Sequence, residues 1–151
     1  MVGVDDSAAR DLIDGIDAAL GPWVVRSVTE MMTAWRGECP PPVAQAAARA
    51  ASEARAATIP ALAVLLEADI DEQRTTPLAL VRAAVRWPTE VLAGAGVPEV
   101  ERDPFAVRAF PADVYGLSPA SLADLSPDLV EAGIVWGAAK AFEHKRRHAG
   151  S

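Results

Sequence analysis

The chain contains few of the residues that form most redox, metal and nucleophilic sites. It contains one cysteine, Cys39, and two histidines among its 151 residues. A single cysteine excludes a disulfide within the chain and suits a reducing compartment such as the cytoplasm. His144 and His148 have the spacing of two metal ligands on one helix face. Because no third ligand is evident and their neighbours are cationic, we interpret them as cations at a helix end. We predict no bound metal and no cofactor.

Long apolar runs and an excess of basic residues are also absent. The longest strongly apolar run, Ile59–Leu66, is far shorter than the roughly 20 residues that cross a bilayer as a helix. The formal net charge is -7, and a chain of that charge is repelled by phosphate backbones and anionic lipid surfaces. We therefore expect neither nucleic acid nor membrane as a partner. The acidic N-terminal residues do not resemble a secretion signal, so we predict a cytoplasmic protein.

Segments typical of strands, rich in valine, isoleucine, threonine and aromatics, are missing as well. What the chain has instead is 51% hydrophobic residues and many alanines, and alanine is the best helix former. A chain of this length fits one domain and can bury a core without a disulfide or a metal. We predict an all-α protein, a compact single-domain bundle of five or six helices over residues 1–151.

Prolines and glycines set the expected helix boundaries, because proline breaks the backbone hydrogen-bond ladder and glycine favours helix ends. A first helix is expected to end at Gly21-Pro22, where a second begins. Pro60 is expected either to kink one long helix or, as we prefer, to divide the following alanine-rich segment into two helices with little or no gap. A further helix, opened by Pro77, should bend at Pro88. The last helix is expected to start at Ser126-Pro127.

The segment 103–126, which we call the strap, combines aromatic residues with prolines that prevent one continuous helix. A connection of this length with little regular structure is uncommon in a compact domain. Exposing its large apolar side chains would forfeit roughly 1.5–3 kcal/mol of burial for each, so we expect the strap to lie against the helices. Two interpretations stay open. It seals the core, with Asp113 and Ser118 serving local turns, or it forms one wall of a binding site with Arg108, Asp113 and Tyr115 facing outward.

Three charged residues are expected on one face of the helix that carries Trp87. Arginine suits bidentate recognition of carboxylates, so Arg82 and Arg86 with Glu90 are candidates for binding a partner or ligand. The alternative is a solvated face with one ion pair between Arg86 and Glu90, four residues apart. The full set of candidate binding residues is Arg82, Arg86, Trp87, Glu90, Arg108, Phe110 and Tyr115.

Small residues recur every four positions in the last helix, at Gly133, Gly137 and Ala141. Such a pattern lets another helix approach closely, which would offset the cost of roughly 1 kcal/mol for each glycine inside a helix. The partner helix is either the alanine-rich face around Ala46 and Ala50 of the same chain or a second copy of the protein.

No phosphate loop, nucleophile elbow or zinc-protease motif occurs in the sequence. Two classes of function remain open. We favour a non-enzymatic interaction or regulatory protein, whose partner is another protein or a second copy of itself. The alternative is a small-molecule-binding protein or small enzyme, since pockets are mainly apolar with few polar groups. Its predicted pocket is walled by Trp87, Phe110, Tyr115 and Trp136.

Overall fold

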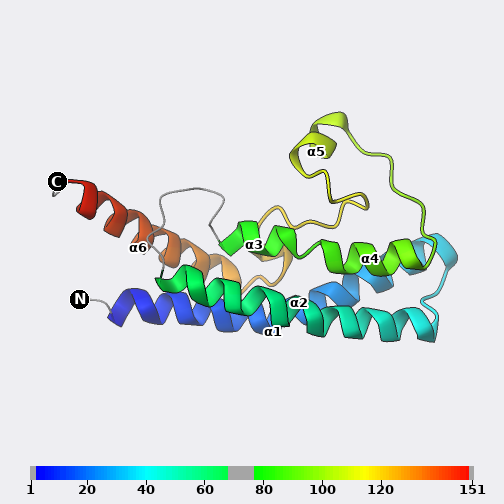
Figure 1. Cartoon of the computed structure of the whole chain (residues 1–151), viewed down its shortest axis with the longest axis horizontal. Helices are drawn as coiled ribbons and strands as arrows, with labels where there is room; N and C mark the ends of the chain where they lie inside the picture. Colours follow the sequence, from blue (N-terminus) through cyan, green and yellow to red (C-terminus); the bar gives the residue numbers. More distant parts are fainter. Residues whose placement is uncertain (1–2, 68–76, 150–151) are drawn as a thin grey trace.

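A computed structural model describes residues 3–67 and 77–149 of the chain. Most of these residues are helical, and no strand occurs among them (Figure 1). The elements are α1 (Gly3–Arg36), α2 (Pro41–Glu67), α3 (Pro77–Ala83), α4 (Arg86–Gly94), α5 (Pro104–Ala109), the 3-10 helix η2 (Leu122–Asp124) and α6 (Leu129–Ala149). The prediction of an all-α bundle of five or six helices is confirmed for this part of the chain.

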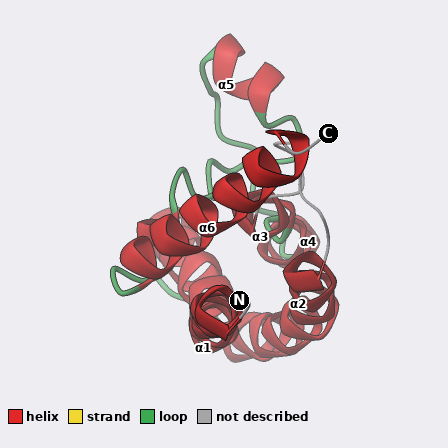
Figure 2. Cartoon of the chain, turned by 90° about the vertical axis from the view of Figure 1, so that its left-hand side faces the viewer, coloured by secondary structure: helices red, strands yellow, loops and turns green. Residues whose placement is uncertain are grey.

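The two longest helices, α1 and α2, pack side by side in opposite directions and form the base of the bundle (Figure 1). α4 contacts both of them and α3 contacts α2, while α6 crosses α1 and also contacts η2. Seen along the bundle, these helices surround a common core, whereas α5 lies apart from them (Figure 2). α5 accordingly contains no buried residue.

The core is built on one stripe of α1, because its apolar residues recur every three or four positions. Leu12, Ile16 and Leu20 are fully buried. One part of the core joins this stripe to α2, α3 and α6, and the other joins the C-terminal half of α1 to α4 and the strap. An exposed ion pair also links α1 to α2, with Arg55 Nε 2.8 Å from Asp17 Oδ1. This pair raises the pKa of Arg55.

Two of the expected helix breaks are wrong, because α1 continues through Pro22 and α2 continues through Pro60. A proline inside a helix costs about 3 kcal/mol relative to alanine. Both rings point to the exposed side of their helices, so the bundle loses no packing there. The buried stripes on either side of each proline keep the helices continuous, since burying each large apolar side chain gains about 1.5–3 kcal/mol.

A third expectation, one helix bent at Pro88, is also wrong in its detail. The helix divides into α3 and α4 at Ala84 and Val85, and Pro88 lies in the first turn of α4, where proline is tolerated. The break comes four residues before Pro88 because the proline ring collides with the carbonyl at that distance. The chain tightens there into three-residue turns, in which the N–H of Trp87 donates to the carbonyl oxygen of Ala84 at 3.2 Å.

Candidate functional site

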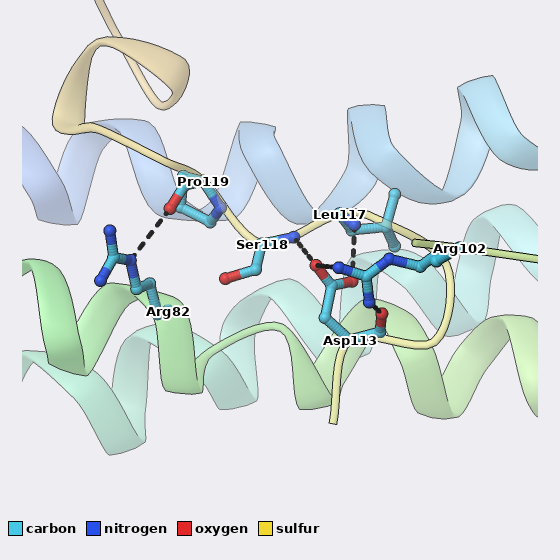
Figure 3. A network of polar contacts seen from close by, with 6 residues as sticks. All are labelled: Arg82, Arg102, Asp113, Leu117, Ser118 and Pro119. Carbon is cyan, nitrogen blue, oxygen red and sulfur yellow. Dashed lines mark hydrogen bonds and ion pairs between the residues drawn. The ribbon is translucent and has the colours of Figure 1, made fainter. Parts of the chain in front are cut away.

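The strap is anchored by a carboxylate rather than by its aromatics alone. Asp113 is only 3% exposed, and its two oxygens accept hydrogen bonds from the N–H groups of Leu117 at 2.6 Å and Ser118 at 2.7 Å. The guanidinium of Arg102 lies 3.9 Å from the same carboxylate and donates to the carbonyl oxygen of Asp113 (Figure 3). Asp113 therefore serves a local turn, as the first interpretation of the strap predicts.

Arg82 holds the strap to α3. Its Nε and one terminal nitrogen donate to the carbonyl oxygens of Pro119 and Ala120, each at 3.3 Å, and its guanidinium lies over the ring of Phe110 at 5.0 Å. Figure 3 shows Arg82 pointing at the strap beside the Asp113 turn. Two of the candidate binding residues, Arg82 and Phe110, are thus engaged within the chain.

Tyr115 is buried, with 4% of its surface exposed, and its hydroxyl donates to the carbonyl oxygen of Val97 at 2.7 Å. The expectation that Tyr115 and Asp113 face outward is therefore wrong, because the turn that Asp113 closes directs both side chains inward. Phe105 behaves in the opposite way and is 71% exposed, since α5 stands away from the bundle. Residues 113–126 of the strap cover the core, whereas most of residues 103–112, including Arg108, are exposed.

Tyr115→Phe is expected to lower the stability at neutral pH by about 1 kcal/mol, the net worth of one hydrogen bond. Burial, and secondarily the charge of Glu99, raise the pKa of Tyr115 above its ordinary value of 10.0. Since the fold disfavours the ionised phenol, the stability that this group contributes is complete below pH 10 and is lost as pH rises through the higher folded-state pKa. The phenylalanine variant should lack that part of the alkaline loss.

Tyr115 is the only tyrosine of the chain, so tyrosinate absorbance reports this residue alone. We expect its titration midpoint to lie higher in the folded protein than in urea. Equal midpoints, or an alkaline stability loss that Tyr115→Phe leaves unchanged, would contradict the prediction.

Two of the candidate binding residues, Trp87 and Glu90, line a groove between α2 and α4 with a volume of about 470 Å³. Alanines on α2, including Ala46 and Ala50, leave room along its floor, and Val91 and Trp87 of α4 face them. Three charged residues complete the lining, Arg49 and Glu53 from α2 and Glu90 from α4. The groove is consequently an apolar trough with a charged rim.

Arg86, Trp87 and Glu90 form a small cluster at this groove. Arg86 Nε lies 3.8 Å from Glu90 Oε1, with both side chains largely exposed, and its guanidinium covers the ring of Trp87 at 4.7 Å. An exposed pair of this kind contributes at most about 1 kcal/mol to stability. The arrangement therefore leaves Glu90 exposed at the groove, whereas Trp87 lines the groove and also packs against the core.

The predicted binding residues do not all come together. Trp87 and Glu90 line the groove, whereas Arg82 and Phe110 contact each other at the strap. Of the four aromatic residues of the predicted pocket, only Trp87 lines the groove between α2 and α4. Tyr115 and Trp136 belong to different parts of the core.

Sequence reasoning missed that the alanine-rich part of α2 forms the groove floor. Arg49 and Glu53, which line the groove beside this floor, are four residues apart in sequence, a spacing at which two side chains can pair along one helix. The available signal was the run of alanines beside those charges, because small side chains on a packed helix leave space.

In the glycine pattern of α6, Gly133 packs closely against other described residues of the chain. A Cβ on Gly133 would collide with the Leu122 side chain of η2 and would touch Leu12 of α1. The expected contact with the alanine face of α2 is wrong, since α6 packs mainly on α1 and η2. Gly137 and Ala141 lie on the exposed side of α6, so their role in a dimer stays a prediction.

Two general features of the described residues complete the picture. No group of three or more histidine, cysteine, aspartate or glutamate side chains is placed there to hold a metal ion. No helix among them is long and apolar enough to cross a membrane. The side chains of His144 and His148 fall outside the part of α6 whose side chains are described.

Comparison with known proteins finds no family model, no curated protein and no solved structure that matches this chain.

Proposed function

We propose that this protein is a non-enzymatic interaction protein that binds a segment of another protein in the groove between α2 and α4. The observation that carries the proposal is the groove itself, a trough of about 470 Å³ with an apolar floor and charged residues along its rim. Grooves between two helices commonly receive an amphipathic helix, whose apolar face fills the trough.

The rim favours a basic partner. Glu53 and Glu90 face the groove from opposite helices, where Arg49 is the one cation of the lining and the exposed Arg86 pairs with Glu90 beside it, and the whole chain carries a net charge of -7. Trp87 adds an aromatic surface of the kind enriched at interaction hot spots. The expected occupant therefore places an apolar side chain against Trp87 and a lysine or arginine beside each carboxylate.

The test is site-specific photo-crosslinking in cells of the natural source, with a photoreactive residue at Ala46 on the groove floor. We expect a discrete protein adduct that weakens about tenfold, equivalent to about 1.4 kcal/mol, when Glu53→Arg and Glu90→Arg reverse the rim charge. Glu101→Arg, an exposed position outside the groove lining, paired with an equally exposed second reversal at Glu99, is the matched control for net charge. The same adduct from a probe at exposed Ala93, or equal labelling in all variants, would contradict the proposal.

A small-molecule function is the second candidate, and the size of the groove favours it. Ligand pockets span about 300–1,000 Å³, which includes this groove. A metabolite that raises the melting temperature of the wild type and not of Trp87→Ala would support this candidate. The absence of any such ligand, together with a specific crosslinked protein, would leave the interaction function.

The proposal includes a cytoplasmic location, which suits a chain with the single thiol of Cys39. Fractionation of cells that express the tagged chain at its natural level tests this location.

A further inference from the structure

The side of α6 that faces away from the bundle is mostly apolar, and no other part of residues 3–67 and 77–149 covers it. Leu129 and Trp136 are buried on the inner side. On the outer side Ile134 is 66% and Phe142 is 68% exposed, and Val130 and Val135 are more than two-fifths exposed. Exposed apolar side chains gathered on one helix in this way mark an interaction surface.

This outer side follows the repeat of a helix-pairing seam. The relevant positions alternate by three and four residues: Glu131, Ile134, Ala138, Ala141 and Lys145. All five are exposed. Positions with this alternation stay on one line along two helices that wind around each other. The seam therefore has small residues at its centre, an apolar residue on one side of them and opposite charges at its two ends.

We propose that a second copy of this chain docks along this seam, with the two α6 helices antiparallel and the two-fold axis at Ala138. In that register Glu131 lies beside Lys145 of the second copy, and the pair repeats on the other side of the axis. A parallel arrangement would instead place Glu131 beside Glu131 and Lys145 beside Lys145, and like charges at such positions destabilise a helix pair. The distribution of charge along the seam thus selects the antiparallel arrangement.

The same register also brings apolar residues of the two copies together. It places Phe142 of the second copy beside Ile134, next to a hollow of about 260 Å³ that is lined by Leu78, Leu122, Val130 and Ile134, among others. The lining residues of this hollow come from α3, from α6 and from η2 and the residues just before it. An exposed phenylalanine on one copy and an apolar hollow on the other are complementary, and the two-fold axis makes each contact twice.

The small residues at the centre of the seam allow the two α6 helices to approach each other closely. Gly137, Ala138 and Ala141 are exposed, and a Cβ added to Gly137 would meet nothing in its own chain within 4 Å. No contact with the described part of the chain therefore accounts for this glycine. Close approach of a second backbone at this point does, since small residues reduce the distance between packed helices.

The test is a charge-swap series measured by sedimentation equilibrium at low salt. Glu131→Lys and Lys145→Glu are each expected to raise the dimer dissociation constant about tenfold, and the double variant is expected to restore it. Glu131 and Lys145 are fourteen residues apart on one helix, so they cannot compensate each other within a copy, and rescue can only arise between antiparallel copies. Glu101→Lys is the control for net charge, and circular dichroism confirms that each variant stays helical.

A second measurement does not depend on salt. In a Cys39→Ser background, Ala138→Cys is expected to form a disulfide-linked dimer under mild oxidation, because the two-fold axis brings this position to its own copy. Ala93→Cys, exposed on α4, should form no disulfide link between copies. A wild type that remains monomeric at high concentration, or single variants that weaken the dimer without rescue in the double, would overturn the proposal. The groove between α2 and α4 takes no part in these contacts, so this result is independent of the proposed function.

Discussion

Asp113→Ala is expected to destabilise the protein by about 3–5 kcal/mol, the usual result of removing one partner of a buried, hydrogen-bonded ion pair. The substitution leaves the N–H groups of Leu117 and Ser118 without their acceptor. It also leaves Arg102, whose side chain is only 14% exposed, without its counter-charge. Urea denaturation followed by circular dichroism measures the loss.

The chain offers a matched control for this variant in Asp124. Its carboxylate also accepts two strap N–H groups, from Ala120 at 2.7 Å and Ser121 at 2.9 Å, but Asp124 is exposed. Asp124→Ala should therefore cost only about 1 kcal/mol, as for a helix cap. Similar losses in the two variants would show that burial of Asp113 contributes little.

Trp136→Ala is expected to cost about 3–5 kcal/mol, as for other large aromatic residues in a packed core. Trp136 is the most voluminous buried side chain of α6, and it joins the core cluster that includes Leu12 of α1. The Nζ of Lys140 lies 5.9 Å from its ring and donates to the carbonyl oxygen of Leu66 at 2.8 Å. Loss of the indole should weaken the attachment of α6 to both α1 and α2.

Phe105→Ala is the control for the tryptophan variant, since it removes an aromatic ring that is largely exposed, and it should change stability by less than about 0.5 kcal/mol. Both variants are measured by thermal and urea unfolding at low protein concentration, so that association along α6 does not add to the stability. A small effect of Trp136→Ala would mean that α6 is held mainly by its other contacts.

The sequence predicts the helical class well because that prediction depends on periodicity along the whole chain. It fails at Pro22 and Pro60 because the rule for proline is local, whereas the packing that keeps α1 and α2 continuous involves residues far apart in sequence. It also fails for Phe105, since hydrophobicity gives the cost of exposure but not whether the backbone brings a side chain to the core.

The candidate site is harder to predict than the fold, for a specific reason. Arg82 and Arg86 would share one face of a continuous helix, but the tightened turns at Ala84 and Val85 turn them toward different neighbours. Arg82 contacts the strap, and Arg86 contacts Trp87 and Glu90. The groove itself arises only when α2 packs against α4, so neither helix alone contains the information that predicts it.

Three side chains that join distant segments of this protein do so by donating to main-chain carbonyl oxygens. Arg82 does so to Pro119 and Ala120, Tyr115 to Val97, and Lys140 to Leu66. Every amino acid supplies a carbonyl, whereas few supply a donor of the required length and shape. At each such hydrogen bond, substitution should therefore be tolerated more readily at an exposed residue that supplies the carbonyl than at the residue that supplies the donor. A saturation library should accept many residue types at the exposed position 120 and few at 82 and 115, and evolutionary change should follow the same asymmetry.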